Sequence, residues 1–260
     1  MKETKTEKKS AVKQIGMAIF IAIAVLLALF FFYTENYYHA GSAAYGSLTS
    51  TESVDVIMED WGFCFDGPGT EDILIFYPGG KVEETAYAPL MQELAEQGLD
   101  CCLVRMPFRL AVFDAKRAEF ILAEKIADPA SPEGAETKRP RSELYDRAFI
   151  GGHSLGGAMA ASFAADHPEL LDGVILLAAY STKELPEDLP VLSIYGTEDG
   201  VLNREKYETY RANLPDLQEI VLEGGNHAQF GDYGKQRGDG EASISAEEQL
   251  DQTAQAILEW

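Results

Sequence analysis

The sequence is short of positive charge, of histidine and of cysteine. It has 21 lysines and arginines against 43 aspartates and glutamates, a formal net charge of −22, with four histidines and three cysteines in 260 residues. So acidic a chain is poorly suited to nucleic acid or to anionic lipid surfaces, because like charges repel. We therefore expect no nucleic-acid partner. A length of 260 residues allows one substantial domain and a tail.

The cysteines do not indicate a metal site or a disulfide framework, because their spacing suits no metal and their number is odd. Cys101 and Cys102 lie in a short apolar run, which favours small side chains buried in a strand. A bond from Cys64 to either of them stays open if the domain is exported.

A long run without charge lies near the N-terminus. Residues 15–33 contain only uncharged side chains, and a helix of this length spans about 28 Å, close to the hydrocarbon thickness of a bilayer. Five lysines and two glutamates in residues 1–13 give a local charge of +3, which leaves −25 for the rest of the chain.

This pattern predicts a cytoplasmic basic tail over residues 1–14 and a single transmembrane signal-anchor helix over 15–33 in the cell membrane, with the remainder on the extracellular side. The run exceeds the apolar core of most signal peptides, although the small residues 42–44 would suit cleavage, so removal of the segment stays an alternative.

After a polar spacer expected over residues 34–55, one domain over 56–260 is predicted. Apolar runs that read as buried strands alternate with segments of helical period, which indicates a mostly parallel sheet covered by helices on both faces. We expect strands at 72–77, 101–104, 148–151, 174–179, 191–195 and 219–222; helices at 87–98, 111–127, 155–165, 204–214 and 246–258; and a surface loop at 128–142.

Ser154 is the predicted nucleophile. The segment from Gly152 to Gly156 fits G-x-S-x-G and lies between a predicted strand and a predicted helix. In that context the serine sits on a tight turn, and glycines avoid the clashes that side chains would cause there. The five-residue pattern alone is weak evidence, and its position carries the prediction.

A serine hydroxyl needs a base to take its proton, and a third group must hold that base. His227 is the one histidine that follows a predicted strand and lies downstream of Ser154. The acid should lie between them in the chain, where Asp199 follows the strand at 191–195 and Glu198 is its rival.

Main-chain amides should stabilise the negative charge that develops on the substrate oxygen. We expect these amides from Leu155 and from Gly80 in the loop after the first strong strand, with Lys81 as the second choice for the loop donor. Neither glycine pattern of nucleotide binding is present.

These motifs resemble the α/β-hydrolase family, and more narrowly a small lidless bacterial subgroup. The resemblance covers residues 56–260, although Pro78-Gly79 stands where many relatives have His-Gly. The motifs that carry it are Tyr77–Val82 (YPGGKV), Arg105–Pro107 (RMP), Gly152–Gly157 (GHSLGG), Gly196–Asp199 (GTED) and Gly224–Gly231 (GGNHAQFG).

The resemblance implies a serine hydrolase, most simply a carboxylic ester hydrolase that acts on a small acyl substrate through an acyl-enzyme on Ser154. Such a reaction needs no metal or organic cofactor. The link from Ser181 to Pro190 is too short for a lid domain. A catalytically silent binding domain of the same fold and an acyltransferase are the alternatives.

Overall fold

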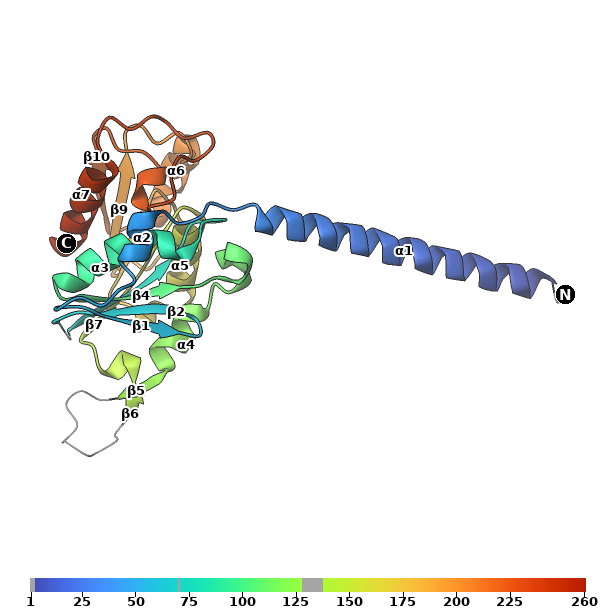
Figure 1. Ribbon diagram of the computed structural model, residues 1–260, viewed down its shortest axis with the longest axis horizontal. Coiled ribbons are helices and arrows are strands. Elements are labelled where there is room, and N and C mark those ends of the chain that lie inside the picture. The colour runs from blue at the N-terminus through green and yellow to red at the C-terminus, as the bar shows by residue number, and fades with distance from the viewer. Residues whose placement is uncertain (1–2, 70, 128–137) are drawn as a thin grey trace. The chain divides into compact units, whose positions relative to one another are not determined.

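The computed structural model describes residues 3–69, 71–127 and 138–260. The chain divides into two compact units, residues 1–37 and residues 38–260 (Figure 1). The catalytic motifs expected from the sequence all lie in the second unit.

The first unit is the helix α1 (Glu3–Glu35). Its stretch from Lys13 to Glu35 is long and apolar enough to cross a membrane, and within the described residues it is the one helix that meets this criterion. The structure therefore has a helix where the sequence predicts an anchor. Its orientation in a membrane stays a prediction.

The second unit is built on an eight-stranded sheet in the order β1-β2-β4-β3-β7-β8-β9-β10. The six strands from β4 to β10 are parallel, and β1 and β2 add an antiparallel edge. The strands are β1 (Asp55–Glu59), β2 (Gly62–Asp66), β3 (Asp72–Tyr77), β4 (Leu99–Val104), β7 (Arg147–His153), β8 (Gly173–Leu177), β9 (Val191–Gly196) and β10 (Leu217–Leu222).

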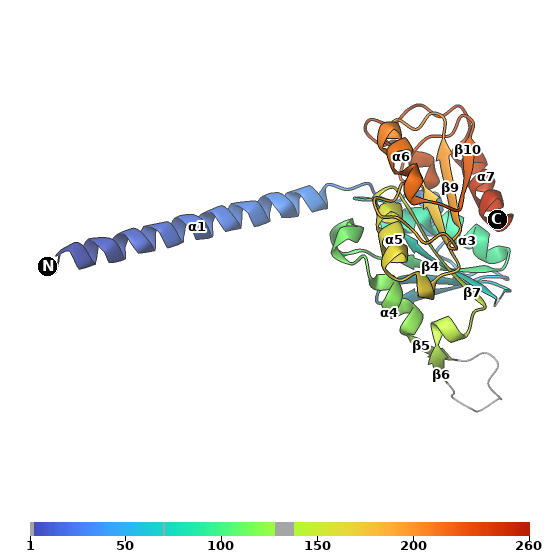
Figure 2. The same ribbon diagram turned by 180° about the vertical axis from the view of Figure 1, so that it is seen from behind.

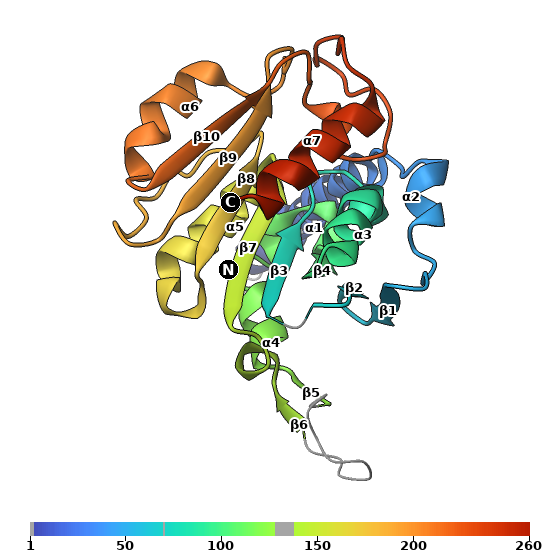
Figure 3. The ribbon, with the colours of Figure 1, turned by 90° about the vertical axis from the view of Figure 1, so that its left-hand side faces the viewer.

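Helices cover both faces of this sheet, with α3 and α7 on one side and α5 on the other (Figure 3). The α-helices are α2 (Ser42–Gly46), α3 (Ala88–Glu96), α4 (Arg117–Ala123), α5 (Leu155–Asp166), α6 (Arg204–Tyr210) and α7 (Ala246–Leu258). Short 3-10 helices are η1 (Glu84–Tyr87), η2 (Pro107–Arg109), η3 (Ala111–Phe113), η4 (Arg141–Glu143), η5 (Pro168–Leu170), η6 (Arg211–Asn213) and η7 (Ala228–Phe230).

The central strands are apolar on both faces because each face packs on helices. In β3, Leu74 and Phe76 belong to the core under α3 and α7, whereas Ile73, Ile75 and Tyr77 belong to the core under α4 and α5. Successive side chains of a strand point to opposite faces, so a fully covered strand needs an unbroken apolar run. The predicted mostly parallel α/β sheet is confirmed.

The helix predicted at 111–127 is wrong for most of its length. Residues 111–113 form η3, only Arg117–Ala123 form α4, and Lys125–Ala127 form a strand, β5. Asp114 interrupts the helix because its backbone is not helical (φ −152°, ψ 49°). Phe113, in η3, is 52% exposed.

The surface loop predicted at 128–142 also needs correction. Residues 128–137 lie outside the described part of the chain, but Lys138–Pro140 form β6 and pair with β5 as a short antiparallel hairpin (Figure 2). Arg141 is only 4% exposed. The polar composition of this segment gave no sign that its end would pair with a strand.

Residues 38–54, expected as a spacer, instead pack on the domain. Tyr38 forms a β-bridge with Val82, and the N–H of Gly41 donates to the carbonyl oxygen of Asp232. Ala44, in α2, is fully buried. Small side chains let this segment lie close against the domain, and small residues are equally typical of linkers, so composition misled.

Cys64 and Cys102 face each other across the antiparallel pair β2–β4. They are register partners, and their Sγ atoms lie 3.3 Å apart in the core under α4. Cys101 points to the opposite face of the sheet. The choice left open by the sequence is therefore decided: only Cys102 is placed to bond to Cys64.

We predict that a disulfide-exchange oxidant such as oxidised glutathione links Cys64 to Cys102 and leaves Cys101 free. Peptide mass spectrometry without reduction would show this pairing. The hydrogen bond with Cys64, and then burial, raise the pKa of the Cys102 thiol, so the reaction should be slow. Cys101→Ser should keep the link and Cys102→Ser should abolish it, and a bond from Cys64 to Cys101 would contradict the register.

Candidate active site

Ser154 lies on a strained turn between β7 and α5. Its backbone has φ 54° and ψ −119°, a region that costs a residue with a side chain on the order of 1–3 kcal/mol. The turn is close-packed: a methyl group at Gly152 would lie 2.6 Å, and one at Gly156 2.2 Å, from the carbonyl oxygen of Tyr77. These glycines let the turn press against the end of β3.

His227 and Asp199 form a buried hydrogen-bonded pair at the ends of neighbouring strands. His227 follows β10, Asp199 follows β9, and the His227 Nδ1 to Asp199 Oδ2 distance is 2.8 Å. The two side chains are 1% and 0% exposed. The rival carboxylate, Glu198, is an exposed residue of the same turn.

The Asp199 carboxylate is held in its ionised form. Burial alone would raise its pKa, but the hydrogen bond and charge of His227, with the N–H groups of Leu202 and Val201, lower the pKa below its usual value. Those N–H groups donate to Oδ1 at 2.7 and 2.8 Å.

An ionised carboxylate only accepts hydrogen bonds, so Nδ1 of His227 carries the proton that it donates. In the neutral ring the other nitrogen, Nε2, is an acceptor. It is buried, and none of the described residues forms a hydrogen bond with it.

His227 lies next to the turn that carries Ser154. The ring of His153, the residue before Ser154, has its centroid 4.4 Å from that of the His227 ring. Three of the residues predicted from the sequence are therefore brought to one edge of the sheet, beyond the carboxyl ends of the parallel strands, where α/β proteins bind ligands.

A sequence profile of the alpha/beta hydrolase family matches residues 73–130 and 132–251. The chain belongs to this family.

Two solved structures show a similar fold. A dienelactone hydrolase from Anabaena variabilis has a TM-score of 0.56 at 13% identity, covering 80% of this chain and 99% of that one. A predicted CIB-like hydrolase from Thermoplasma acidophilum has a TM-score of 0.51 at 14% identity, covering 80% of this chain and 100% of that one.

A curated relative from Mycobacterium phage D29, provisionally named a non-heme haloperoxidase, is 29% identical over 124 residues. The match covers 47% of this chain and 41% of that protein, so the chain spans about two fifths of the relative's length.

The loop after β3 brings Gly80 against the turn that carries Ser154. A methyl group at Gly80 would lie 2.8 Å from Cδ2 of Leu155, the first residue of α5. The amide of Lys81 instead donates to the carbonyl oxygen of Arg109 at 2.8 Å. Of the two loop amides considered as donors to the substrate oxygen, the amide of Lys81 therefore already donates a hydrogen bond within the protein.

Tyr87 and His153 form a buried pair that the sequence did not indicate. The Tyr87 hydroxyl accepts a hydrogen bond from the Gly79 amide at 3.0 Å and lies 2.8 Å from Nδ1 of His153. Burial raises the pKa of Tyr87, so the phenol keeps its proton and its O–H donates a hydrogen bond to Nδ1. Burial, and then the charge of His227, hold the pKa of His153 well below its usual range, so its ring is neutral.

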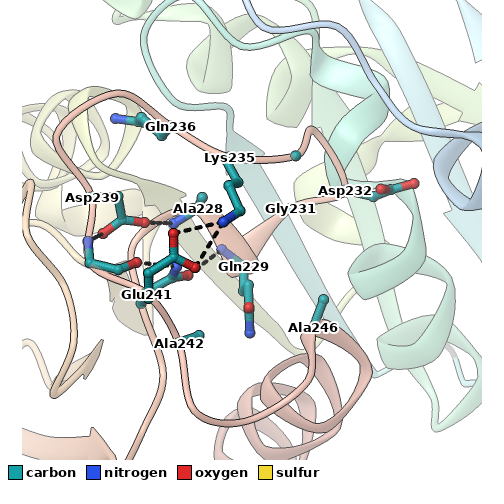
Figure 4. A pocket seen from close by; sticks show the side chains of 13 residues that line it. Ala228, Gln229, Gly231, Asp232, Lys235, Gln236, Asp239, Glu241, Ala242 and Ala246 are labelled. Carbon is teal, nitrogen blue, oxygen red and sulfur yellow. Dashed lines mark hydrogen bonds and ion pairs between the residues drawn. The ribbon is translucent and has the colours of Figure 1, made fainter.

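Asp239 joins the turns that hold His227 and Asp199. Its Oδ1 accepts from the N–H groups of His227 at 3.2 Å and Gly200 at 3.1 Å, and its Oδ2 accepts from Ala228 at 2.8 Å. Figure 4 shows Asp239 directed at Ala228 from a loop that follows η7. Nothing in its sequence context marks this residue, because only the folded loop brings it back to His227.

The cavity in Figure 4 has a volume of about 290 Å³ and lies beside the His227 turn. Its lining includes both neighbours of His227, Asn226 and Ala228, but neither His227 nor Ser154. An exposed ion pair between Lys235 and Glu241 borders it. Within the described residues, no three histidine, cysteine, aspartate or glutamate side chains are grouped so as to hold a metal ion.

We predict that Asp199→Asn lowers stability at neutral pH and that the loss shrinks in acid. The folded state lowers the pKa of Asp199, so its ionised form stabilises the fold above the unfolded pKa of about 3.9, and this contribution disappears as the pH falls below that value. Loss of a charged hydrogen bond should cost about 1–3 kcal/mol.

Thermal unfolding of the full-length protein in detergent, followed from neutral pH to about pH 3, would measure this difference. Glu198→Gln is the matched control, and its unfolding temperature should follow that of the wild type throughout. Equal losses at neutral and acid pH would show that the pair does not depend on the charge of Asp199.

Proposed function

We propose that this protein is a serine hydrolase in which Ser154 is the nucleophile, His227 the base and Asp199 the residue that orients the base. The observation that carries the proposal is the buried His227–Asp199 pair beside the strained turn of Ser154. Nε2 of His227, His153 and His167 lacks a hydrogen-bond partner among the described residues, but of these three histidines only His227 has its Nδ1 on a buried carboxylate.

The proposed reaction is acyl transfer in two steps. Nε2 of His227 takes the Ser154 proton as Oγ attacks the carbonyl carbon, and the resulting imidazolium is stabilised by ionised Asp199. The imidazolium then protonates the leaving group, which leaves an acyl-enzyme. Water then attacks the acyl carbon while Nε2 takes a proton from it, and the imidazolium returns that proton to Oγ as the bond between Oγ and the acyl carbon breaks, which releases the acid and restores Ser154.

We assign the stabilisation of the negative charge on the substrate oxygen to the main-chain amides of Leu155 and Gly80. Leu155 begins α5, where unbonded N–H groups point out of the helix, and Gly80 lies against Leu155. Bonding of the Lys81 amide to Arg109 supports Gly80 as the loop donor. A neutral His153 adds no second positive charge beside the imidazolium.

Small or exposed acyl groups suit this site best, and a carboxylic ester is the simplest substrate. Residues 178–190, between β8 and β9, contain no helix or strand and so form no lid. Without that roof, a long acyl chain would stay largely in water, which gains no apolar burial.

We also propose that α1 anchors the hydrolase in the cell membrane, with the N-terminus in the cytoplasm and the domain outside. Lysines precede the apolar stretch, as the positive-inside rule requires. Removal of the segment near residues 42–44 would cut into α2 and take away Tyr38 and Gly41, which contact the domain. This packing favours an uncleaved anchor.

We expect Ser154→Ala and His227→Ala each to lower the turnover of a short-chain ester by several orders of magnitude. The two residues act on one proton, so the double variant should lose little more than either single variant. Wild-type protein should be labelled at Ser154 by a fluorophosphonate probe, and Ser154→Ala should not. Near-additive losses would argue against a shared mechanism, whereas a folded wild type that resists the probe would favour the silent binding domain.

Asp199→Asn should lower turnover by up to about 10⁴-fold, because asparagine can hold the imidazole in the wrong tautomer. Glu198→Gln is the control, and its effect should stay within about tenfold. A more damaging Glu198→Gln in folded protein would move the role by one residue.

Full-length protein should stay with membranes after alkaline extraction, and external protease should digest the domain in spheroplasts. These results are expected because the apolar stretch can satisfy its backbone groups only as a spanning helix. A soluble product that begins near Ala44 would show cleavage instead.

A further inference from the structure

A cluster of exposed apolar side chains lies after β4. Phe108, Val112, Phe113 and Phe120 are 51%, 51%, 52% and 65% exposed, and we call them the Phe108–Phe120 surface. The rings of Phe108 and Phe113 are in edge contact at 5.5 Å. Among the described residues after Tyr38, every highly exposed phenylalanine lies here. Exposed apolar clusters of this kind mark interaction sites.

The same segment is basic in a domain that is otherwise acidic. Residues 105–120 contain Arg105, Arg109, Lys116 and Arg117 against Asp114 and Glu119, a local charge of +2, whereas the chain after residue 13 carries −25. Arg105 pairs with Glu84, and Arg117 pairs with Asp114, but the arginine side chains stay 44% and 35% exposed. Aromatic and basic side chains together suit the surface of an anionic membrane.

Main-chain hydrogen bonds link this segment to Tyr38, the first residue of the domain. The Tyr38 N–H donates to the Lys81 carbonyl oxygen at 2.8 Å, and the Lys81 N–H donates to the Arg109 carbonyl oxygen at 2.8 Å. Only residues 36 and 37 separate the end of α1 from Tyr38. Three residue steps reach at most about 11 Å, so an anchored α1 would hold the Arg109 segment near the lipid headgroups whatever the angle of the helix.

We propose that the Phe108–Phe120 surface docks on the anionic bilayer in which α1 is anchored. The phenylalanines enter the headgroup region, and the four basic side chains contact anionic headgroups. The proposal rests on the proposed anchoring. It deepens the proposed function, because Lys81 follows Gly80 and docking therefore places the oxyanion loop at the lipid–water interface, where the substrate is an acyl ester presented by the membrane surface.

Fluorescence quenching in vesicles tests the docking. Full-length Phe113→Trp is reconstituted in anionic vesicles whose phospholipids are brominated near the headgroup end of the acyl chain. We expect the added tryptophan signal, after subtraction of wild type, to fall by about half, because docked aromatic side chains lie at headgroup depth. Val112→Trp is a second probe should Phe113→Trp not fold. Leu258→Trp, at the end of α7, is the control and should keep its signal.

Charge reversal tests the basic residues. Lys116→Glu in the Phe113→Trp background should lower the ratio of docked to free domain by about fivefold or more, because each basic residue near an anionic surface contributes about that factor. Lys206→Glu, on α6, should leave the quenching unchanged. Equal quenching in neutral and anionic vesicles would overturn the role of the basic residues.

Flotation of the same vesicles separates the two proposals. Protein that does not float with lipid would overturn the anchor, whereas protein that floats but shows no more quenching at Phe113→Trp than at Leu258→Trp would overturn the docking alone. Activity towards a soluble ester is unaffected by either result, because the surface contains none of the proposed catalytic residues.

Discussion

The site depends on one hydrogen bond, between Nδ1 of His227 and Oδ2 of Asp199. Both side chains are almost fully buried. A buried charge on Asp199 is stable only while this bond and the hydrogen bonds from the two N–H groups to Oδ1 are in place. The bond in turn requires that β9 and β10 run parallel in a register that pairs Gly196 with Leu222, because that register brings the following turns to one level. Asp239 then joins these turns through main-chain N–H groups.

Close packing holds Ser154 in position, whereas hydrogen bonds hold His227 in position. The turn at Ser154 presses on the carbonyl oxygen of Tyr77 at two glycines, and Gly80 presses on Leu155. The turn that carries Ser154 is therefore positioned by contacts of backbone on backbone, whereas the loop of Gly80 packs on the side chain of Leu155. A site that must hold its geometry is better supported by such rigid elements than by flexible side chains.

The strands were predictable because a sheet covered on both faces needs unbroken apolar runs. Residues 72–77 and 191–195 have such runs, and the structure places β3 and β9 there. The edge strands β1 and β2 were missed because their apolar runs, residues 56–58 and 63–65, are only three residues long, shorter than those of the central strands. The helix at 111–127 failed for another reason: its apolar residues fit a helical period, but the backbone leaves the helical region at Asp114, and Phe113 stays exposed while Ile121 and Leu122 are buried. Periodicity records which residues are apolar and does not record which become buried.

The sequence by itself predicted Ser154 as the nucleophile, then a carboxylate in the turn after residues 191–195, then His227, each following a strand. These features are local, since they depend on a turn that requires glycine and on strands that end at a given residue. The tertiary structure alone decided that Asp199 rather than Glu198 meets His227, that the Lys81 amide is engaged with Arg109, and that Cys102 rather than Cys101 faces Cys64. Each of these is a choice between neighbours in the chain. Adjacent residues are nearly equivalent in a sequence pattern, and only the direction of the backbone in three dimensions separates them.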